Sequence, residues 1–201
     1  MKTLNTLIAA MAVCAAGLTT AAQADDTFAS LTYGQTSDKI RKSGLLQRNT
    51  DHFNADGIIG KDSTYGVRLG QINDQGRYYL TYDNVSNDHN GVKLRQENLL
   101  GSYDAFLPIT DTTKLFGGGS LGMVKLSQES KGASRDTDYG YAVGLQAGVL
   151  QQVTDNTSVE LGYRYLRSNA ATEISSHDGP KAGTLRLTSS AQTYLAASYK
   201  F

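Results

Sequence analysis

The sequence predicts an all-β protein, a transmembrane barrel of eight antiparallel strands that run up and down in chain order. Two observations support this fold class. Along eight segments, apolar or aromatic residues alternate with small or polar ones, and in a strand such alternation places the two sets on opposite faces. The connections after the first, third, fifth and seventh segments are long or polar, and those after the second, fourth and sixth are short, as in barrels that cross an outer membrane.

The composition favours strands and turns over helices. The chain has 201 residues, among them 21 glycines and 12 tyrosines, with only two prolines and no tryptophan. The formal net charge is zero, so the charge balance does not indicate a nucleic-acid partner. The mean hydropathy of −0.36 is low, but in a membrane barrel only alternate residues of each strand face lipid, and the average hides them.

The first 24 residues are expected to be a cleaved signal peptide, and residues 25–201 the barrel domain. Lys2 supplies a positive charge, residues 7–18 form an apolar run, and residues 22–24 give a small-x-small cleavage pattern. The apolar run is too short for a spanning helix; an uncleaved anchor is the alternative.

Cysteine usage agrees with export. Cys14 lies in the middle of the apolar run and follows Val13, which is not the arrangement of a lipoprotein. The mature chain is therefore expected to contain no cysteine and no disulfide.

The first two strands are predicted over residues 27–35 and 63–72. In the first strand one face carries Ala29, Leu31 and Tyr33. Between the two strands, residues 36–62 are polar and show no clear period, so a large loop is expected there. Residues 73–76, Asn-Asp-Gln-Gly, then give a tight hairpin signal.

The third and fourth strands are predicted over residues 77–85 and 92–107. The third sets Tyr78, Leu80 and Tyr82 on one face, and a short loop over 86–91 follows it. The fourth begins with charged residues that should project beyond the membrane. It ends at a turn over 108–113, where proline does not break a strand pairing.

The fifth and sixth strands are predicted over residues 114–126 and 138–153, with a polar loop over 127–137 between them. The glycines of residues 117–119 invite comparison with a phosphate-binding loop, but no Lys-Ser or Lys-Thr pair follows them. They are better explained by the strong curvature of a small barrel. The sixth strand has the cleanest alternation of all.

The last two strands are predicted over residues 158–167 and 185–201. A turn over 154–157 precedes the seventh strand, and a polar loop over 168–183 precedes the eighth. The eighth strand carries apolar and aromatic residues on one face, small and polar residues on the other, and it stops on an aromatic residue. These features are those of a closing strand.

The distribution of residues between the two faces favours a membrane barrel over a soluble one. A soluble eight-stranded barrel of the lipocalin kind would place its apolar residues inside, around a ligand. Here glycines and charges share one face, and most tyrosines lie on the other. Those tyrosines fall towards both ends of the strands, which predicts two aromatic girdles at the membrane surfaces.

The chain resembles the small eight-stranded outer-membrane β-barrels, the group of OmpX and the OmpA membrane domain. The resemblance lies in NLLGSYDAFL (98–107), LFGGGSLGM (115–123), VELGYRY (159–165) and the terminal YKF (199–201). It implies an integral protein of the bacterial outer membrane. It also implies that Tyr199 and Phe201 form the signal read by the outer-membrane assembly machinery.

Several charged residues are predicted to point into the barrel. They are Arg68, Asp83, Asp104, Glu160, Arg164 and Arg186. An eight-stranded barrel is just wide enough for side chains to fill, and buried ions need partners. We therefore expect a structural salt-bridge network, with Glu160 and Arg164 four residues apart on one face of a strand. The alternative is a narrow gated pore whose charges exchange partners.

An outer-leaflet lipid-modifying enzyme is a weaker alternative. The histidines His52, His89 and His177 all fall in predicted loops, and none lies in a His-x-Ser pattern. No catalytic residue, enzymatic activity or cofactor is therefore predicted.

A metal site is not predicted either. The carboxylates Asp51, Asp56 and Asp62 of the first loop match no calcium-loop spacing.

The first loop is the external candidate for ligand contact, through Lys39, Arg41, Lys42 and Arg48. Their positive charge suits lipopolysaccharide phosphates, host glycans or a protein ligand. The sequence thus predicts a monomeric outer-membrane protein, surrounded by lipid and lipopolysaccharide. Its expected role is in envelope integrity, or in surface interaction and adhesion through its loops.

Overall fold

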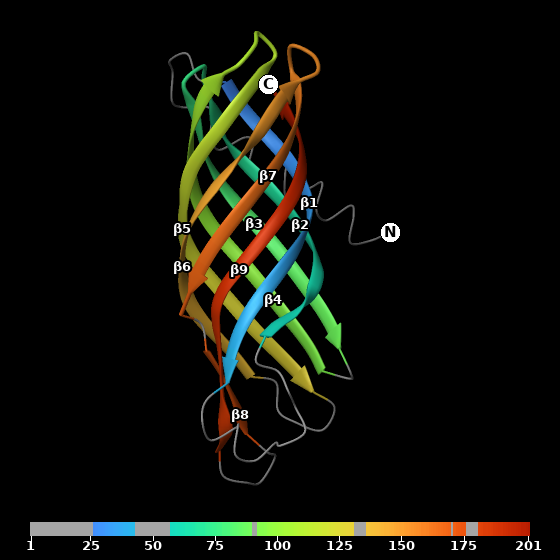
Figure 1. Ribbon diagram of the computed structural model, residues 1–201, viewed down its shortest axis with the longest axis vertical. Helices are drawn as coiled ribbons and strands as arrows, with labels where there is room; N and C mark the ends of the chain where they lie inside the picture. The colour runs from blue at the N-terminus through green and yellow to red at the C-terminus, as the bar shows by residue number, and fades with distance from the viewer. Residues whose placement is uncertain (1–25, 43–56, 90–91, 131–135, 170, 176–180) are drawn as a thin grey trace.

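The computed structural model is a closed barrel of long, tilted strands (Figure 1). It describes residues 26–42, 57–89, 92–130, 136–169, 171–175 and 181–201. The barrel strands are β1 (Asp26–Lys42), β2 (Gly57–Ile72), β3 (Gly76–His89), β4 (Val92–Pro108), β5 (Thr113–Ser130), β6 (Asp136–Gln152), β7 (Thr157–Ser168) and β9 (Lys181–Lys200). A short strand, β8 (Ala171–Ser175), pairs with β9. No helix in the described ranges is long and apolar enough to span a membrane.

Each barrel strand pairs antiparallel with its neighbour in the order β1 to β7 and then β9. The pairing of β1 with β9 closes the ring, in a register that runs from Phe28 opposite Lys200 to Lys42 opposite Leu185. At the end of the chain the amide of Phe201 donates to the carbonyl of Thr27 at 3.0 Å. Closure removes the two free edges that an open sheet of these eight barrel strands would have. The predicted fold class is confirmed.

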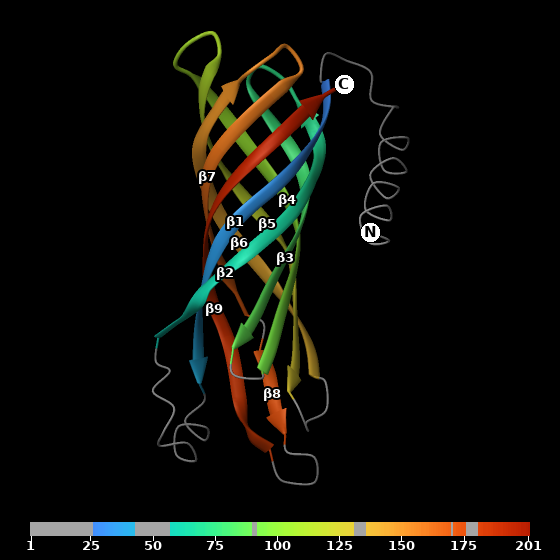
Figure 2. The ribbon, with the colours of Figure 1, turned by 90° about the vertical axis from the view of Figure 1, so that its right-hand side faces the viewer.

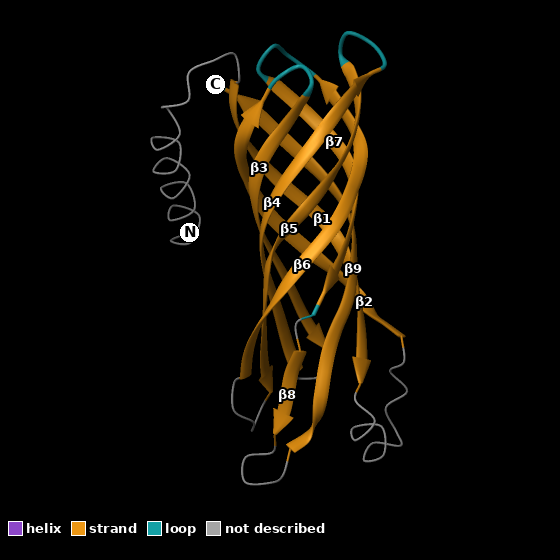
Figure 3. Ribbon diagram, turned by 90° about the vertical axis from the view of Figure 1, so that its left-hand side faces the viewer, coloured by secondary structure: helices purple, strands orange, loops and turns teal. Residues whose placement is uncertain are grey.

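The two ends of the barrel differ in their connections (Figures 2 and 3). The turns β2–β3, β4–β5 and β6–β7 lie at one end, together with the start of β1 and the end of β9; we call this the short-turn end. In the first of these turns the Asn73 side chain accepts hydrogen bonds from the amides of Gln75 and Gly76, at 3.0 and 2.9 Å. The opposite end, where β8 lies, is the long-loop end.

The predicted bounds of the long loops are wrong by several residues. β1 and β2 extend into the loop expected over 36–62, and β8 and the start of β9 occupy much of the loop expected over 168–183. β3 likewise reaches His89, and β5 and β6 enter the loop expected over 127–137. The register between β1 and β2 shifts at Ser37/Asp38, where the partner of Ser37 is Lys61 and that of Asp38 is Ile59. The extra residue lies on β2, and such a bulge breaks the alternation that marks a strand in the sequence.

The outward face carries a band of exposed apolar side chains. Leu121 and Leu145, near mid-strand, are 71% and 72% exposed. Towards the long-loop end the rings of Tyr33 and Tyr65 lie 5.1 Å apart, and at the other end Tyr199 and Phe201 stack at 6.3 Å. An apolar band between two aromatic rows is the surface that a membrane barrel presents to lipid.

Glycine decides how closely β4 and β5 approach each other. A Cβ on Gly122 would overlap the carbonyl oxygen of Leu99 and stand 2.8 Å from the Cα of Leu100, both on β4. On the same strand Gly117 is exposed and has nothing within 4 Å of an added Cβ. Only the first position therefore requires glycine.

This contrast predicts unequal effects of two alanine substitutions on β5. Gly122→Ala should lower the free energy of unfolding by about 1–3 kcal/mol, because the added methyl group forces the β4 backbone away. The matched control, Gly117→Ala, should cause no loss. Urea unfolding in lipid vesicles, followed by the electrophoretic shift of the folded barrel, measures both values. Equal effects would contradict the packing argument.

Candidate functional site

The interior of the barrel holds three arginines and three carboxylates, which we call the lumen network. Its members are Arg68, Arg77, Arg164, Asp83, Asp104 and Glu160, and none is more than 3% exposed. The formal charges balance within this set. A buried charge is tolerated only when it is paired and hydrogen-bonded, so the arrangement of these six side chains decides whether the interior is stable.

Glu160 of β7 is the central member of the lumen network. Its Oε1 lies 2.5 Å from Nη1 of Arg68 on β2, and its Oε2 lies 2.5 Å from Nη1 of Arg77 on β3. Arg77 also contacts Asp104 of β4, with Nε and Nη2 each 2.9 Å from Oδ2. One carboxylate thus connects strands from opposite parts of the ring across the lumen.

Arg164 forms a second pair, with its Nη1 2.6 Å from Oδ2 of Asp83 on β3. The ring of Tyr194 lies between the two halves of the network, because its centroid is 4.4 Å from the Arg68 guanidinium carbon and 5.6 Å from that of Arg164. A cation over an aromatic face is attracted to the ring, most strongly where water is excluded.

Neutral side chains complete the hydrogen bonding of Asp104. The Tyr79 hydroxyl donates to Oδ2 at 2.9 Å, and Nε2 of Gln146 donates to Oδ1 at 2.7 Å. The Ser120 hydroxyl in turn donates to Gln146. Asp104 thus has partners on both carboxylate oxygens, which offsets much of the cost of burying it.

Apolar side chains pack inside the barrel on both sides of these charges. On the long-loop side the buried cluster is Leu100, Val124, Leu126, Ala142, Leu166 and Leu187. Towards the short-turn end it is Phe116, Leu150, Tyr194 and Ala196, with Phe106 packed against them. The interior is therefore a packed core, as expected for a barrel of eight strands.

The structure places most of the predicted interior charges inside the barrel. Glu160 and Arg164 do not pair with each other, since each pairs with residues of β2 or β3. The backbone of Arg186 lies opposite Arg41, near the long-loop end, and its side chain lies outside the described part of the structure.

Arg77 is a member that the sequence analysis missed. It stands at the first predicted residue of its strand, where it was assigned to neither face. The alternation would have identified it, because Arg77 is two residues from Tyr79 and four from Thr81, both on the inward face.

A polar cluster lies on the outward face of β3, β4 and β5, towards the long-loop end. At its centre, Glu97 accepts a hydrogen bond from the Tyr82 hydroxyl at 2.8 Å. Lys125 and Arg95 lie 3.0 and 3.3 Å from the same carboxylate. The hydrogen bond from Tyr82 is the largest cause that lowers the pKa of Glu97, so this carboxylate is ionised at neutral pH.

A second group of cations lies on the outward face where the barrel closes. β1 and β7 are the two barrel neighbours of β9, and on each of them the residue that pairs with Ser189 is a cation. These residues are Lys39 and Arg167, and both are exposed. We call these two residues, together with Arg95 and Lys125, the basic rim.

The predicted ligand-contact residues are not all loop residues. Lys39, Arg41 and Lys42 belong to β1, which corrects their assignment to the first loop. The side chains of Arg41 and Lys42, and the whole of Arg48, lie outside the described part. So do His52, His177 and the side chain of His89. In the described ranges, no group of three or more His, Cys, Asp or Glu residues could hold a metal ion.

Asp38 is a buried carboxyl inside the long-loop mouth, beyond Tyr33 and so beyond the membrane band. It is 4% exposed and accepts a hydrogen bond from the Ser190 hydroxyl. Burial raises the pKa of Asp38 to about 6; the Ser190 hydroxyl opposes this shift and Asp62 adds to it. This mouth therefore gains negative charge as the pH rises from mildly acidic to neutral.

The lumen network predicts a large difference between two Glu→Gln substitutions. Glu160→Gln leaves two buried arginines without their shared carboxylate and should lower the free energy of unfolding by about 3–5 kcal/mol. Glu97→Gln removes ion pairs on the outward face and should cost about 1 kcal/mol or less. Urea titration of both variants in vesicles measures the difference. A loss for Glu160→Gln no greater than for Glu97→Gln would show that the network does not support the fold.

No protein-family model matches this chain. A search of curated proteins likewise finds no match.

Solved structures do match. The solution structure of outer membrane protein H (OprH) from P. aeruginosa is 58% identical, covers 88% of this chain and 99% of that chain, and superimposes with a TM-score of 0.57. Neisserial surface protein A is 16% identical, covers 87% of this chain and 97% of its own, and has a TM-score of 0.65. Ail of Yersinia pestis is 12% identical, with 89% and 100% covered and a TM-score of 0.54.

The similarity to Neisserial surface protein A and to Ail concerns the fold alone. The similarity to outer membrane protein H is one of sequence and covers nearly the whole of that chain. Together with the closed barrel and its lipid-facing band, this sequence similarity shows the family. The chain belongs to the small eight-stranded outer-membrane β-barrel proteins, with outer membrane protein H as a relative, and it is located in the bacterial outer membrane.

Proposed function

We propose that this protein is a structural, non-enzymatic component of the outer membrane, a filled barrel whose long-loop end contacts lipopolysaccharide and so supports envelope integrity. The observation that carries the proposal is the lumen network. Its six paired charges and the apolar clusters beside them occupy the space through which ions would have to pass.

The shared carboxylate of Glu160 makes opening costly. A path through the lumen requires Glu160 to leave Arg68 and Arg77 at the same time, because its two oxygens are each held at 2.5 Å. Breaking a buried ion pair costs about 3–5 kcal/mol, so the open state would be rare. This supports a filled barrel over a gated pore.

Planar-bilayer recordings test the filled barrel directly. The wild-type protein should give no stable conductance steps, because the network stays paired. Stable steps whose size changes in Glu160→Ala and Arg164→Ala, but not in the outward-facing control Glu97→Ala, would overturn the proposal in favour of a gated pore.

The basic rim supports lipopolysaccharide as the partner. In barrels of this kind the long loops face outwards, so the rim lies at the level of the outer-leaflet head groups. Lys39 and Arg167 flank the same position of β9, and Arg95 and Lys125 stand around one carboxylate. Ammonium and guanidinium groups bind phosphate by charge-assisted hydrogen bonds, and tyrosines beside them suit the membrane interface.

Binding to purified lipopolysaccharide tests this partner. The double variant Lys39→Gln/Arg167→Gln should weaken binding by about tenfold or more, since two charge-assisted contacts are lost, and added salt should weaken wild-type binding. Lys114→Gln, which removes a lysine at the short-turn end, is the control and should bind like wild type. Equal binding by the double variant, or no dependence on salt, would rule out the basic rim as the contact.

Tyr199 and Phe201 suit a role in assembly. Their stacked rings lie at the end of β9 on the outward face, and both are more than half exposed. An exposed aromatic pair at the end of the closing strand is available to the outer-membrane assembly machinery before the barrel closes.

A further inference from the structure

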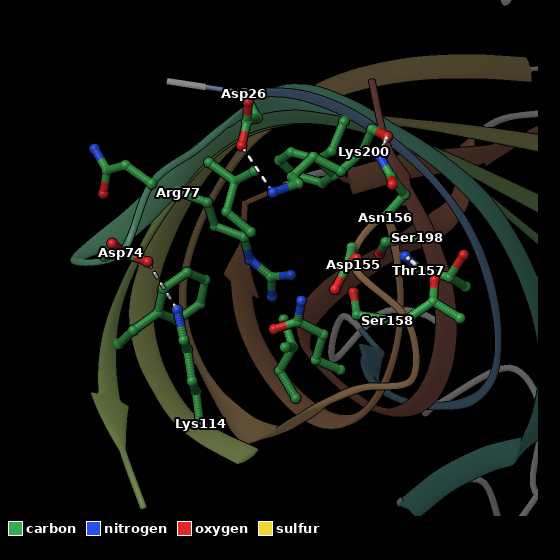
Figure 4. A pocket seen from close by; sticks show the side chains of 17 residues that line it. Asp26, Asp74, Arg77, Lys114, Asp155, Asn156, Thr157, Ser158, Ser198 and Lys200 are labelled. Carbon is green, nitrogen blue, oxygen red and sulfur yellow. Dashed lines mark hydrogen bonds and ion pairs between the residues drawn. The ribbon is translucent and has the colours of Figure 1, made fainter. Parts of the chain in front are cut away.

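A hollow of about 240 Å³ opens at the short-turn end of the barrel. Its walls come from the ends of the barrel strands, Lys114 of β5 among them, and from the β2–β3 and β6–β7 turns (Figure 4). We call it the turn-end cavity. Its volume is below the range of roughly 300–1,000 Å³ that is usual for drug-sized ligands, so a small group fits it.

The positive side of the turn-end cavity is formed by Lys114, next to Arg77, whose own charge is balanced by Glu160 and Asp104. Arg77 belongs to the lumen network and is 1% exposed, and Figure 4 shows its guanidinium directed into the hollow. Lys114 is only loosely paired, because its Nζ is 3.5 Å from Oδ1 of Asp74. By contrast, the other ion pair of the cavity, between Lys200 and Asp26, is 2.9 Å long.

The negative side is formed by Asp155. Figure 4 shows its carboxylate facing the hollow from the side opposite Arg77. Its turn is fixed, since the amide of Thr157 donates to the Thr154 hydroxyl at 3.0 Å and the amide of Val153 donates to the Thr157 carbonyl at 2.9 Å. Within the ranges that the structure describes, Asp155 forms no ion pair.

We propose that the turn-end cavity binds the zwitterionic end of an amino acid or short peptide. The ligand carboxylate lies against Lys114, beside the buried Arg77, and the ammonium group lies against Asp155. A purely anionic or cationic ligand would meet a wall of its own sign, whereas a zwitterion satisfies both walls. Charge-assisted hydrogen bonds in a partly enclosed site are strong enough to hold a small ligand of this kind.

The location of the cavity limits the source of the ligand. Short turns of outer-membrane barrels face the periplasm, so the ligand is either a soluble peptide or a peptide end carried by the cell-wall polymer. The cavity is at the opposite end from the basic rim and uses neither a conducting path nor lipopolysaccharide. Peptide binding at this cavity is therefore independent of the proposed function, and a negative result for one does not bear on the other.

NMR of the full mature chain, ¹⁵N-labelled and folded in detergent micelles, tests the site. The probe is the dipeptide Ala-Ala, and the blocked N-acetyl-Ala-Ala-methylamide is the control ligand. We expect saturable shifts for the amides of residues 73–76 and 153–157 with the free dipeptide alone. No saturable shifts at millimolar dipeptide, or equal shifts with the blocked peptide, would overturn the proposal.

Two variants locate the binding groups. Asp155→Asn and Lys114→Gln should each weaken dipeptide binding by about tenfold, because each removes one charge-assisted contact. The control variant is Asp111→Asn. Asp111 is an exposed residue of the neighbouring β4–β5 turn and does not line the cavity, so this variant should bind the dipeptide like wild type. Unchanged spectra away from the site show that each variant is folded. Wild-type affinity in both site variants would overturn the proposal.

Sedimentation with isolated cell-wall sacculi separates the two sources. If the protein binds both the dipeptide and the sacculi, and Asp155→Asn loses both, the peptide ends of the cell wall are a ligand. Binding of the dipeptide alone assigns soluble peptides, and binding of neither contradicts the site.

Discussion

The structure depends on one carboxylate that two arginines share. Glu160 is held by Arg68 and Arg77 at the same time, and Arg77 carries the connection on to Asp104. A buried charge is stable only where its partners are in place. The outward face is fixed by a general preference for lipid, which many sequences satisfy. The interior is fixed by specific partners, and they hold the strands from β2 to β7 in one register.

The outward face could be predicted from the sequence, because lipid contact imposes a strict alternation that a single chain displays. Leu121, Leu145 and Tyr199 all lie on the face where that alternation placed them. The interior was only partly predictable. The alternation identifies which charges point inwards, but partners come from strands far apart in the chain, so Glu160 could not be matched with Arg68 from spacing. Inward apolar residues such as Leu166 were overlooked, because a polar interior was expected.

The ends of the strands were the least predictable part. Beyond the membrane both faces of a strand meet water, so the alternation that marks its central part disappears. β1 nevertheless continues to Lys42, because backbone pairing with β2 and β9 does not require lipid. Along β1 the alternation of faces continues from Tyr33 to Lys39, so Lys39 lies on the outward surface of a strand rather than in a loop. Register shifts such as the one between β1 and β2 leave little trace in composition.

The pairing of β1 with β9 has a consequence for the order in which the molecule forms. The hydroxyls of Ser30 and Ser198 lie 2.6 Å apart although they are 168 positions apart in the chain. The pairing of β1 with β9 therefore carries the largest loop-closure cost of the strand pairings and forms late. Until it forms, β7 is not held opposite β2, and Glu160 has no fixed partner across the lumen. The buried charges therefore couple ring closure to interior packing, which makes a half-built barrel unstable and favours a transition in which closure and core formation occur together.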